Sequence, residues 1–302
     1  MNLGHDDVID VTGWTVIRVE QGGRDANKRW LAESPTAPRS EHWLWKSRQR
    51  TGGGDERALT DCAEVTVSRL AALLGLPAAD CRYASDDGQT GLVSRNVAGD
   101  LDLYTGATYL PEVQGYERDI DLAARPGLMG AEHGYTLSAV QDVLRGVGPP
   151  PTADQSLSAF EVFAGFLVLD ALVGNGDRHP GNWALLETAS GARLLAPTYD
   201  HGSALGAGLT ELNRADRSPH AFARRGRANP FSPPKTSLVD LAVDALGRCD
   251  GAPWPAAVAN LQESDVTCAL QAPADRMSEV AATFMKAVIL ENQRRLTHAY
   301  AA

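Results

Sequence analysis

Three oxygen-bearing side chains fall within one short segment, residues 174–202, which reads GNGDRHPGNWALLETASGARLLAPTYDHG. Asp177 and Asn182 stand on one loop, and Asp200 follows two short apolar runs that a Ser-Gly turn separates. This pattern predicts a β-hairpin whose two ends return to the same place. Phosphoryl transfer requires such a set of side chains. One carboxylate orients the accepting hydroxyl, while an amide and a second carboxylate hold Mg²⁺ on the phosphates.

The combination carries more weight than any of its parts, because an isolated Asn-Gly-Asp turn is usually only a turn. DRHPGN followed by YDHG closely resembles the catalytic and metal-binding loops of HipA-like kinases, and phosphoinositide lipid kinases share its D-R-H-x-x-N order. The resemblance implies that Asp177 is the catalytic base and that Asn182 and Asp200 are magnesium ligands. Arg178 and His179 belong to the same catalytic loop, where we expect them to brace it, because Asp177 already supplies the base.

A lysine stands where the same resemblance expects one, at the end of the short strand pattern HWLWK. Lys46 would hold the α- and β-phosphates of ATP, whereas the plain alternative is an exposed lysine at a strand end. Glu64, near the start of a helical pattern, would be its ionic partner. Asp61 and Glu64 also fit a capping box, in which Glu64 merely closes the helix start, so both roles stay open.

Two further segments are predicted to bind the nucleotide. The turn that contains Gly22 and Gly23 would cover the phosphates, since glycine permits close backbone approach. The strand GLVSRNV resembles the family's hinge between lobes, so the backbone of Ser94, Arg95 and Asn96 would pair with adenine. The glycine turn carries no Ser or Thr, unlike the loop of the family's toxins, in which a serine is autophosphorylated.

The surrounding elements predict an α+β protein with a two-lobed, protein-kinase-like fold. Residues 1–98 read as strands with one helix from Asp61, a small and mostly β N-lobe that binds nucleotide. Residues 99–302 read as a larger, mostly α C-lobe that carries the catalytic and metal loops. A long buried helix over 156–173 leads into the catalytic loop, and an amphipathic helix covers 278–300. Residues 99–150 are irregular and rich in Gly and Pro, and they give no clear assignment.

Composition bounds the class of protein. The 302 residues are 43% hydrophobic and 22% charged, as in a globular protein of one large or two modest domains. A net charge of −10 argues against non-specific nucleic-acid binding over the whole surface. No apolar run reaches membrane-spanning length and the acidic start shows no secretory signal, so we expect a cytoplasmic protein. The four cysteines form no C-x-x-C pair, which favours free thiols.

One segment is basic, although the chain as a whole is acidic. Residues 217–239 contain His220 and no acid, together with five basic residues: Arg217, Arg224, Arg225, Arg227 and Lys235. The segment follows YDHG, where the acceptor chain docks in a kinase fold. A docking surface for an acidic protein or peptide substrate is one interpretation, and a solvated, partly disordered loop is the other.

The resemblance implies an ATP- and Mg²⁺-dependent kinase that phosphorylates a Ser or Thr hydroxyl of a protein or peptide. A kinase for a small molecule or a lipid is one alternative, and a nucleotide-binding pseudokinase that acts as a scaffold is another. The joint presence of Lys46, Asp177, Asn182 and Asp200 counts against the pseudokinase.

Overall fold

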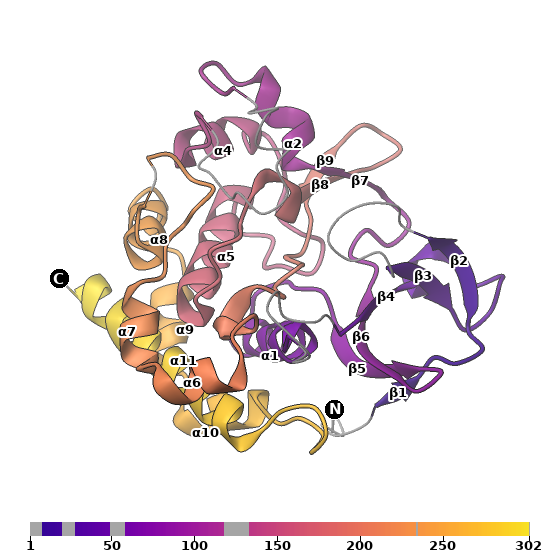
Figure 1. Cartoon of the computed structure of the whole chain (residues 1–302). Coiled ribbons are helices and arrows are strands. Elements are labelled where there is room, and N and C mark those ends of the chain that lie inside the picture. Colours follow the sequence, from indigo (N-terminus) through magenta and orange to yellow (C-terminus); the bar gives the residue numbers. More distant parts are fainter. Residues whose placement is uncertain (1–7, 20–27, 49–57, 118–132, 234, 302) are drawn as a thin grey trace.

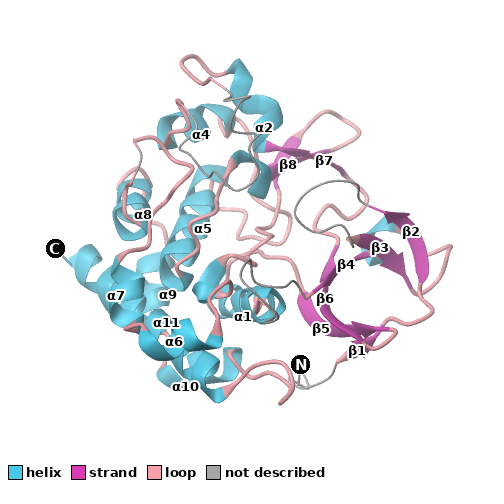
Figure 2. Ribbon diagram, viewed as in Figure 1, coloured by secondary structure: helices cyan, strands magenta, loops and turns pink. Residues whose placement is uncertain are grey.

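The computed structural model describes residues 8–19, 28–48, 58–117, 133–233 and 235–301. A β-sheet from the first third of the chain lies beside a body of helices built from the rest (Figure 2). This arrangement confirms the predicted α+β class with a mostly β N-terminal part and a mostly helical C-terminal part. The turn with Gly22 and Gly23 lies outside the described residues.

The N-terminal sheet has six strands in the order β1-β5-β6-β4-β3-β2 (Figure 1). Their bounds are β1 Ile9–Asp10, β2 Thr15–Val19, β3 Arg29–Ala32, β4 Trp43–Ser47, β5 Cys81–Asp86 and β6 Gln89–Arg95. β1 pairs with β5 in parallel, and every other neighbouring pair is antiparallel. The strands predicted from WTVIRV, KRWLA, HWLWK and the two runs after residue 80 are therefore confirmed.

The alternation of side chains along β4 determines the face of the sheet on which Lys46 lies. Trp43 and Trp45 are buried in a small apolar cluster with Leu31 and Val93. Because successive side chains of a strand point to opposite faces, Lys46 lies on the other face of the sheet. Helix α1, Thr60–Leu73, packs on that side against β5 and β6.

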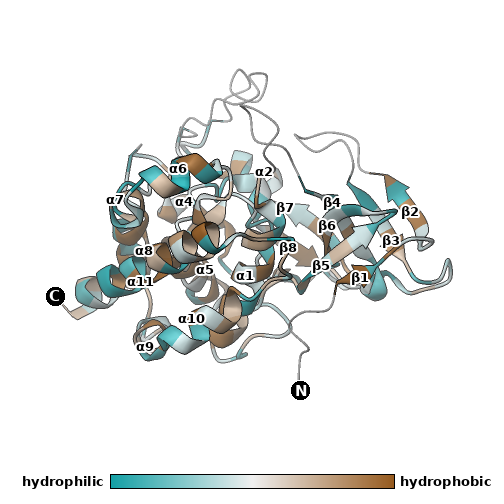
Figure 3. Cartoon of the chain, turned by 60° about the horizontal axis from the view of Figure 1, so that its bottom comes forward, coloured by the Kyte–Doolittle hydropathy of each residue, from teal (hydrophilic) through white to brown (hydrophobic). Residues whose placement is uncertain are grey.

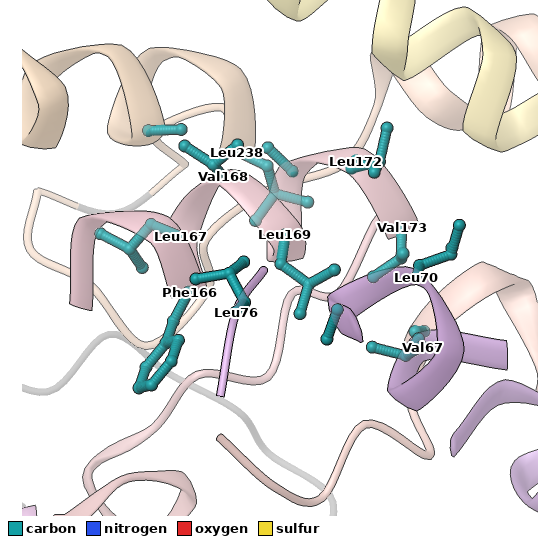
Figure 4. Packing of buried hydrophobic residues seen from close by; sticks show 14 of the residues in the cluster. Val67, Leu70, Leu76, Phe166, Leu167, Val168, Leu169, Leu172, Val173 and Leu238 are labelled. Carbon is teal, nitrogen blue, oxygen red and sulfur yellow. The ribbon is translucent and has the colours of Figure 1, made fainter. Parts of the chain in front are cut away.

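Helix α1 shares its apolar core with the helical body. Val65 and Leu70 of α1 belong to the same cluster of buried residues as Phe166 and Val173 of helix α5, Ala159–Val173. Figure 4 shows Leu70 beside Val173. One hydrophobic core thus crosses the predicted lobe boundary at residue 98, so α1 is packed from both sides.

Local sequence fixes both ends of α5. Ser158 and Glu161 form a capping box at its start, and Gly174 ends it in the left-handed conformation, at φ 66°. Glu161 and Asp170 are the two charged residues of an otherwise apolar helix, and Asp170 is buried. The chain continues from α5 directly into the loop that carries Asp177.

A second sheet of three strands, in the order β7-β8-β9, carries the predicted hairpin. Its strands are β7 Asp102–Thr105, β8 Ala184–Glu187 and β9 Arg193–Leu195. Among the described residues, the remaining helices before the hairpin are η1 Arg39–Glu41, α2 Gly106–Tyr109, η2 Leu110–Glu112, α4 Leu137–Val143 and η3 Pro180–Asn182. Those after it are η4 Ala204–Gly206, α6 Glu211–Asp216, α7 Pro219–Arg224, α8 Leu238–Leu246, α9 Trp254–Asn260, α10 Glu263–Ala269 and α11 Glu279–Ala301.

Helix α11 closes the helical body. It buries Ala281, Phe284, Val288 and Leu296 on one face, as the amphipathic pattern predicts, and shows both hydrophobic and hydrophilic residues along its length (Figure 3). Within the described ranges, no helix combines the length and the apolar character that a membrane span needs.

Candidate active site

Lys46 contacts two carboxylates from distant parts of the chain. Its Nζ donates to Oε1 and Oε2 of Glu64, at 2.9 and 3.1 Å, and to Oδ1 of Asp200 at 2.9 Å. The side chain of Glu64 is 3% exposed and that of Asp200 is 38% exposed. Helix α1 begins after Leu59 without a side-chain cap, so Glu64 does not close a capping box. The structure thus brings Lys46 and Glu64 together in the way the resemblance implies.

The charges around Lys46 fix its protonation state. Burial alone would lower the pKa of Lys46, but the carboxylates of Asp200 and Glu64 raise it above its ordinary value. The same ammonium group lowers the pKa of Asp200, against the effect of burial. The three hydrogen bonds use all three donors of the ammonium group, so a phosphate that binds Lys46 must replace at least one of them.

Asp177 and Asn182 lie on the loop between α5 and β8, and a hydrogen bond within that loop orients the amide. Nδ2 of Asn182 donates to the backbone oxygen of Asp177 at 2.7 Å. Because the nitrogen is used in this way, Oδ1 of Asn182 is left as the acceptor of the group.

Two hydroxyl groups help to join this loop to the segment that carries Asp200. The hydroxyl of Ser203 donates to Oδ2 of Asp177 at 3.1 Å, and the hydroxyl of Tyr199 donates to the backbone oxygen of Gly181 at 3.0 Å. Asp200 itself has φ 61°, a left-handed conformation that is uncommon outside glycine. Backbone strain of this kind persists where the surrounding structure holds it, often at functional sites.

Arg178 anchors the loop to the end of α5 through a buried ion pair. Nε and Nη2 donate to the two carboxylate oxygens of Asp170, both at 2.8 Å, and Nη1 donates to the backbone oxygen of Asn182 at 2.7 Å. Asp170 also accepts a hydrogen bond from Nδ2 of Asn175. Such bidentate pairing sets position as well as energy. Arg178 therefore braces the loop, which is the role expected for it.

His179 shapes the same loop. Its Nδ1 accepts a hydrogen bond from the backbone N–H of Gly181 at 3.0 Å and so caps the short helix η3. Its position, like that of Arg178, is that of a supporting residue.

His201 and Gly202 determine how the loop that carries Asp200 packs against the catalytic loop and against α1. Nε2 of His201 lies 3.3 Å from Nη2 of Arg178, and because arginine only donates, Nε2 is the acceptor. Burial lowers the pKa of His201 well below its usual value, so the ring is neutral. A Cβ on Gly202 would lie 3.3 Å from Oε1 of Glu64, so glycine lets the loop pass close to α1.

The predicted hinge is built into the sheet. Ser94 pairs with Leu44 and Cys81, while the N–H of Arg95 donates to Asp80 O at 2.9 Å and that of Asn96 to His42 O at 3.0 Å. These two N–H groups therefore already donate hydrogen bonds to backbone oxygens of the protein. An adenine ring at this segment would have to use carbonyl groups or the N–H of the following residue.

Several residues that hold the site were not singled out from the sequence. They are Asp170, Asn175, Tyr135, Ser203 and His201. Of these, Asp170 had a recognisable signal, because a lone acid deep in an apolar helix needs a buried partner. Tyr135, whose hydroxyl donates to the backbone oxygen of Arg178, gave none.

The oxygen atoms of the site suit a hard divalent cation. Oδ1 of Asn182 is left as an acceptor by its own amide contact, and the Asp200 carboxylate is ionised. Carboxylate and amide oxygens are ligands of Mg²⁺. Asn182 and Asp200 are thus the residues that would hold the ion, as the sequence predicts.

Comparison with known proteins identifies the fold. The family described as "HipA-like C-terminal domain" matches residues 22–284. The structure is similar to that of the proinflammatory kinase CtkA of Helicobacter pylori, with a TM-score of 0.69 and 16% identity over 98% of both chains. A HipA in complex with HipB and operator DNA, from Shewanella oneidensis MR-1, matches with a TM-score of 0.44 and 13% identity, over 85% of this chain and 60% of that one. No curated protein sequence matches the chain.

Proposed function

Since the chain belongs to the HipA-like C-terminal domain family, we propose that it is an ATP-dependent kinase that phosphorylates a Ser or Thr hydroxyl of a protein or peptide. One observation carries the proposal. Lys46 binds Glu64 and Asp200 at once, while Ser203 ties Asp177 to the loop of Asp200. The fold similarity to a kinase supports the same proposal.

Each polar residue has a task in phosphoryl transfer. Lys46, held as a cation, would bind the phosphates of ATP after releasing one of its carboxylate contacts, and Asp200, the more exposed partner, is the one we expect to move. Asp177 would orient the accepting hydroxyl and take its proton. Mg²⁺, held by Asn182 and Asp200, would neutralise charge on the phosphates. Arg178 would keep the loop in place throughout.

The decisive experiment follows the γ-phosphate. Purified protein is incubated with γ-labelled ATP and Mg²⁺, first alone and then with extracts fractionated into proteins and small molecules. We expect label on Ser or Thr of a protein, and none when Asp177→Asn replaces the wild type. Label on a small molecule or lipid would favour that alternative. ATP binding without transfer to any fraction would favour the scaffold and refute the proposal.

The basic segment is folded over part of its length. Residues 219–224 form α7, so this stretch is helical rather than disordered. Nε of Arg224 donates to Glu291 at 3.0 Å, and Nη1 of Arg227 donates to two backbone oxygens. These two arginines therefore have structural partners.

We propose that the exposed residues Arg217, Arg225 and Lys235 contact an acidic region of the substrate. Charge complementarity speeds encounter and fixes orientation, and salt screens it. Replacing the three residues by Ala should raise the KM for the substrate at low ionic strength and leave kcat and ATP affinity unchanged. Arg145→Ala, an exposed arginine beside α4, is the control. An unchanged KM at low salt would refute the docking proposal.

A further inference from the structure

A second buried ion pair joins Arg48, the residue after β4, to α1, beside the pair formed by Lys46 and Glu64. Nε and Nη2 of Arg48 donate to Oδ1 and Oδ2 of Asp61, at 2.9 and 2.7 Å. The side chains of Arg48 and Asp61 are 7% and 1% exposed. The backbone N–H of Arg48 donates to Thr90 O at 2.8 Å, so the pairing of β4 with β6 continues through this residue.

The spacing of the four residues places the two ion pairs side by side. Lys46 and Arg48 are two apart on an extended strand and face the same side, about 6.6 Å along its axis. Asp61 and Glu64 are three apart on a helix and share a face, about 4.5 Å along its axis. Two fixed points between a strand and a helix restrict both the distance and the rotation of the helix. A single ion pair would fix α1 to the strand at one point only.

Arg276 connects this second pair to the C-terminal part of the chain. It precedes α11, yet its Nη1 lies 3.5 Å from Oδ2 of Asp61 and donates to Gly91 O at 3.0 Å, and its Nη2 donates to Ala84 O at 2.9 Å. Its own backbone oxygen accepts a hydrogen bond from Nη2 of Arg48 at 2.8 Å. A residue of the C-terminal part therefore holds the N-terminal sheet and α1 at the same time.

The two clusters together hold three cations and three carboxylates, and a fourth, exposed carboxylate lies beside Arg276. Asp61 faces two guanidinium groups, from Arg48 and Arg276, whereas the single ammonium group of Lys46 faces Glu64 and Asp200. Oδ2 of Asp275, whose side chain is 75% exposed, lies 3.8 Å from Nε of Arg276. A buried charge without a partner is costly, so the loss of one member disturbs its neighbours.

We propose that Arg48, Asp61 and Arg276 form a positioning cluster that holds α1 at the place where Glu64 binds Lys46. The three residues act through the Lys46–Glu64 pair and touch no reacting atom. The consequence for catalysis rests on the proposed function, but the placement of α1 can be measured without it.

The first test uses kinetics with a matched control. Arg276→Gln should lower kcat on the order of 10- to 100-fold, because a misplacement of about 1 Å can cost about 100-fold. Arg69→Gln is the control, since Arg69 also ties α1 to the C-terminal part, through the backbone oxygens of Ala269 and Gln271, and stands five residues after Glu64 on the helix. The control should lower thermal stability and leave kcat per folded molecule unchanged. Equal kcat values for the two variants would overturn the proposal.

A double-mutant cycle separates positioning from general stability. If Arg276 acts through Glu64, then Arg276→Gln should add little to the loss of kcat that Glu64→Gln causes. Independent, additive losses would contradict the proposal. Arg276→Lys keeps a cation near Asp61 and should recover part of kcat. If Arg276→Gln folds poorly, the Arg276→Lys variant still tests the proposal.

The second test needs no activity. Sγ of Cys62 is buried beside Arg48 and the backbone oxygen of Arg276. Mass spectrometry after alkylation should show faster labelling of Cys62 in Arg276→Gln than in Arg69→Gln, by at least about 10-fold for an opened cluster. If the wild type transfers no phosphate, the kinase proposal fails, and the labelling still decides on the cluster. Equal labelling rates in the two variants would overturn it.

Discussion

Replacing Lys46 by Met should damage both activity and stability, for two separable reasons. The side chain of Glu64 is 3% exposed, and without the ammonium group it becomes a buried carboxylate without its ionic partner. Breaking a buried pair in this way costs about 3–5 kcal/mol. For a protein of this size we expect Tm to fall on the order of 10 °C. Removing a donor that is directed at developing charge costs a further 10²- to 10³-fold in kcat, about 2.7–4 kcal/mol.

A double variant separates the two effects. In Lys46→Met with Glu64→Gln the buried carboxylate is replaced by a neutral amide, so Tm should recover by several degrees. Activity should stay as low as in the single variant, because the cation is still missing. Unfolding is followed by calorimetry, and the rate is expressed per folded molecule.

Two results would refute this reasoning. Unchanged activity per folded molecule in Lys46→Met would show that the lysine serves only the fold. A double variant that regained activity together with Tm would show that the carboxylate, rather than the missing cation, caused the loss.

Three further changes test other parts of the molecule. Asp177→Asn should lower kcat by about 10²- to 10⁴-fold and leave ATP affinity nearly intact, because the base acts on the acceptor; turnover near the wild-type rate would exclude this role. Asp200→Asn should weaken nucleotide binding in calorimetry more with Mg²⁺ than without it, because a charged ligand of the ion is lost, and an equal effect in both would argue against a metal ligand. Hydrogen bonds from Arg294, with help from Arg224, lower the pKa of Glu291 from 4.5 to about 2. Its contribution to stability is therefore complete above pH 4.5 and lost as the pH falls toward 2. Glu291→Gln should flatten the pH dependence of unfolding in that window, and an unaltered slope would contradict the assignment.

The local sequence pattern was sufficient to predict much of the fold. The hairpin β8–β9, helix α5 and helix α11 each follow from spacing and end signals within about twenty residues, and the structure contains all three. Strand β7 was missed in the irregular region, because it is defined by its pairing with β8, about eighty residues later. A strand of four residues carries too little local information to be recognised, even with the turn at Gly99 before it.

The chemistry-bearing residues were visible in the sequence, while the residues that hold them were largely not. Asp177, Asn182 and Asp200 stand in a recognisable order, and the structure places them on two loops that Ser203 joins. Whether Glu64 caps its helix or binds Lys46 depended on a contact between elements, which a capping pattern cannot reveal. The cluster of Arg276 is of the same kind, since nothing near that arginine points to a partner 215 positions earlier.

The sequence separation of these contacts has a consequence for how the protein is made. Lys46 and Asp200 are 154 residues apart, and Asp61 and Arg276 are 215 apart. Closing a flexible loop of that length costs about 5 kcal/mol of chain entropy, which only a folded body of helices can offset. We therefore expect nascent chains that end before Arg276 to have a helical core in part but no working site. Catalytic competence would be acquired in one step, after the segment that carries Arg276 has been synthesised, so the cell would not meet an active enzyme that lacks this segment.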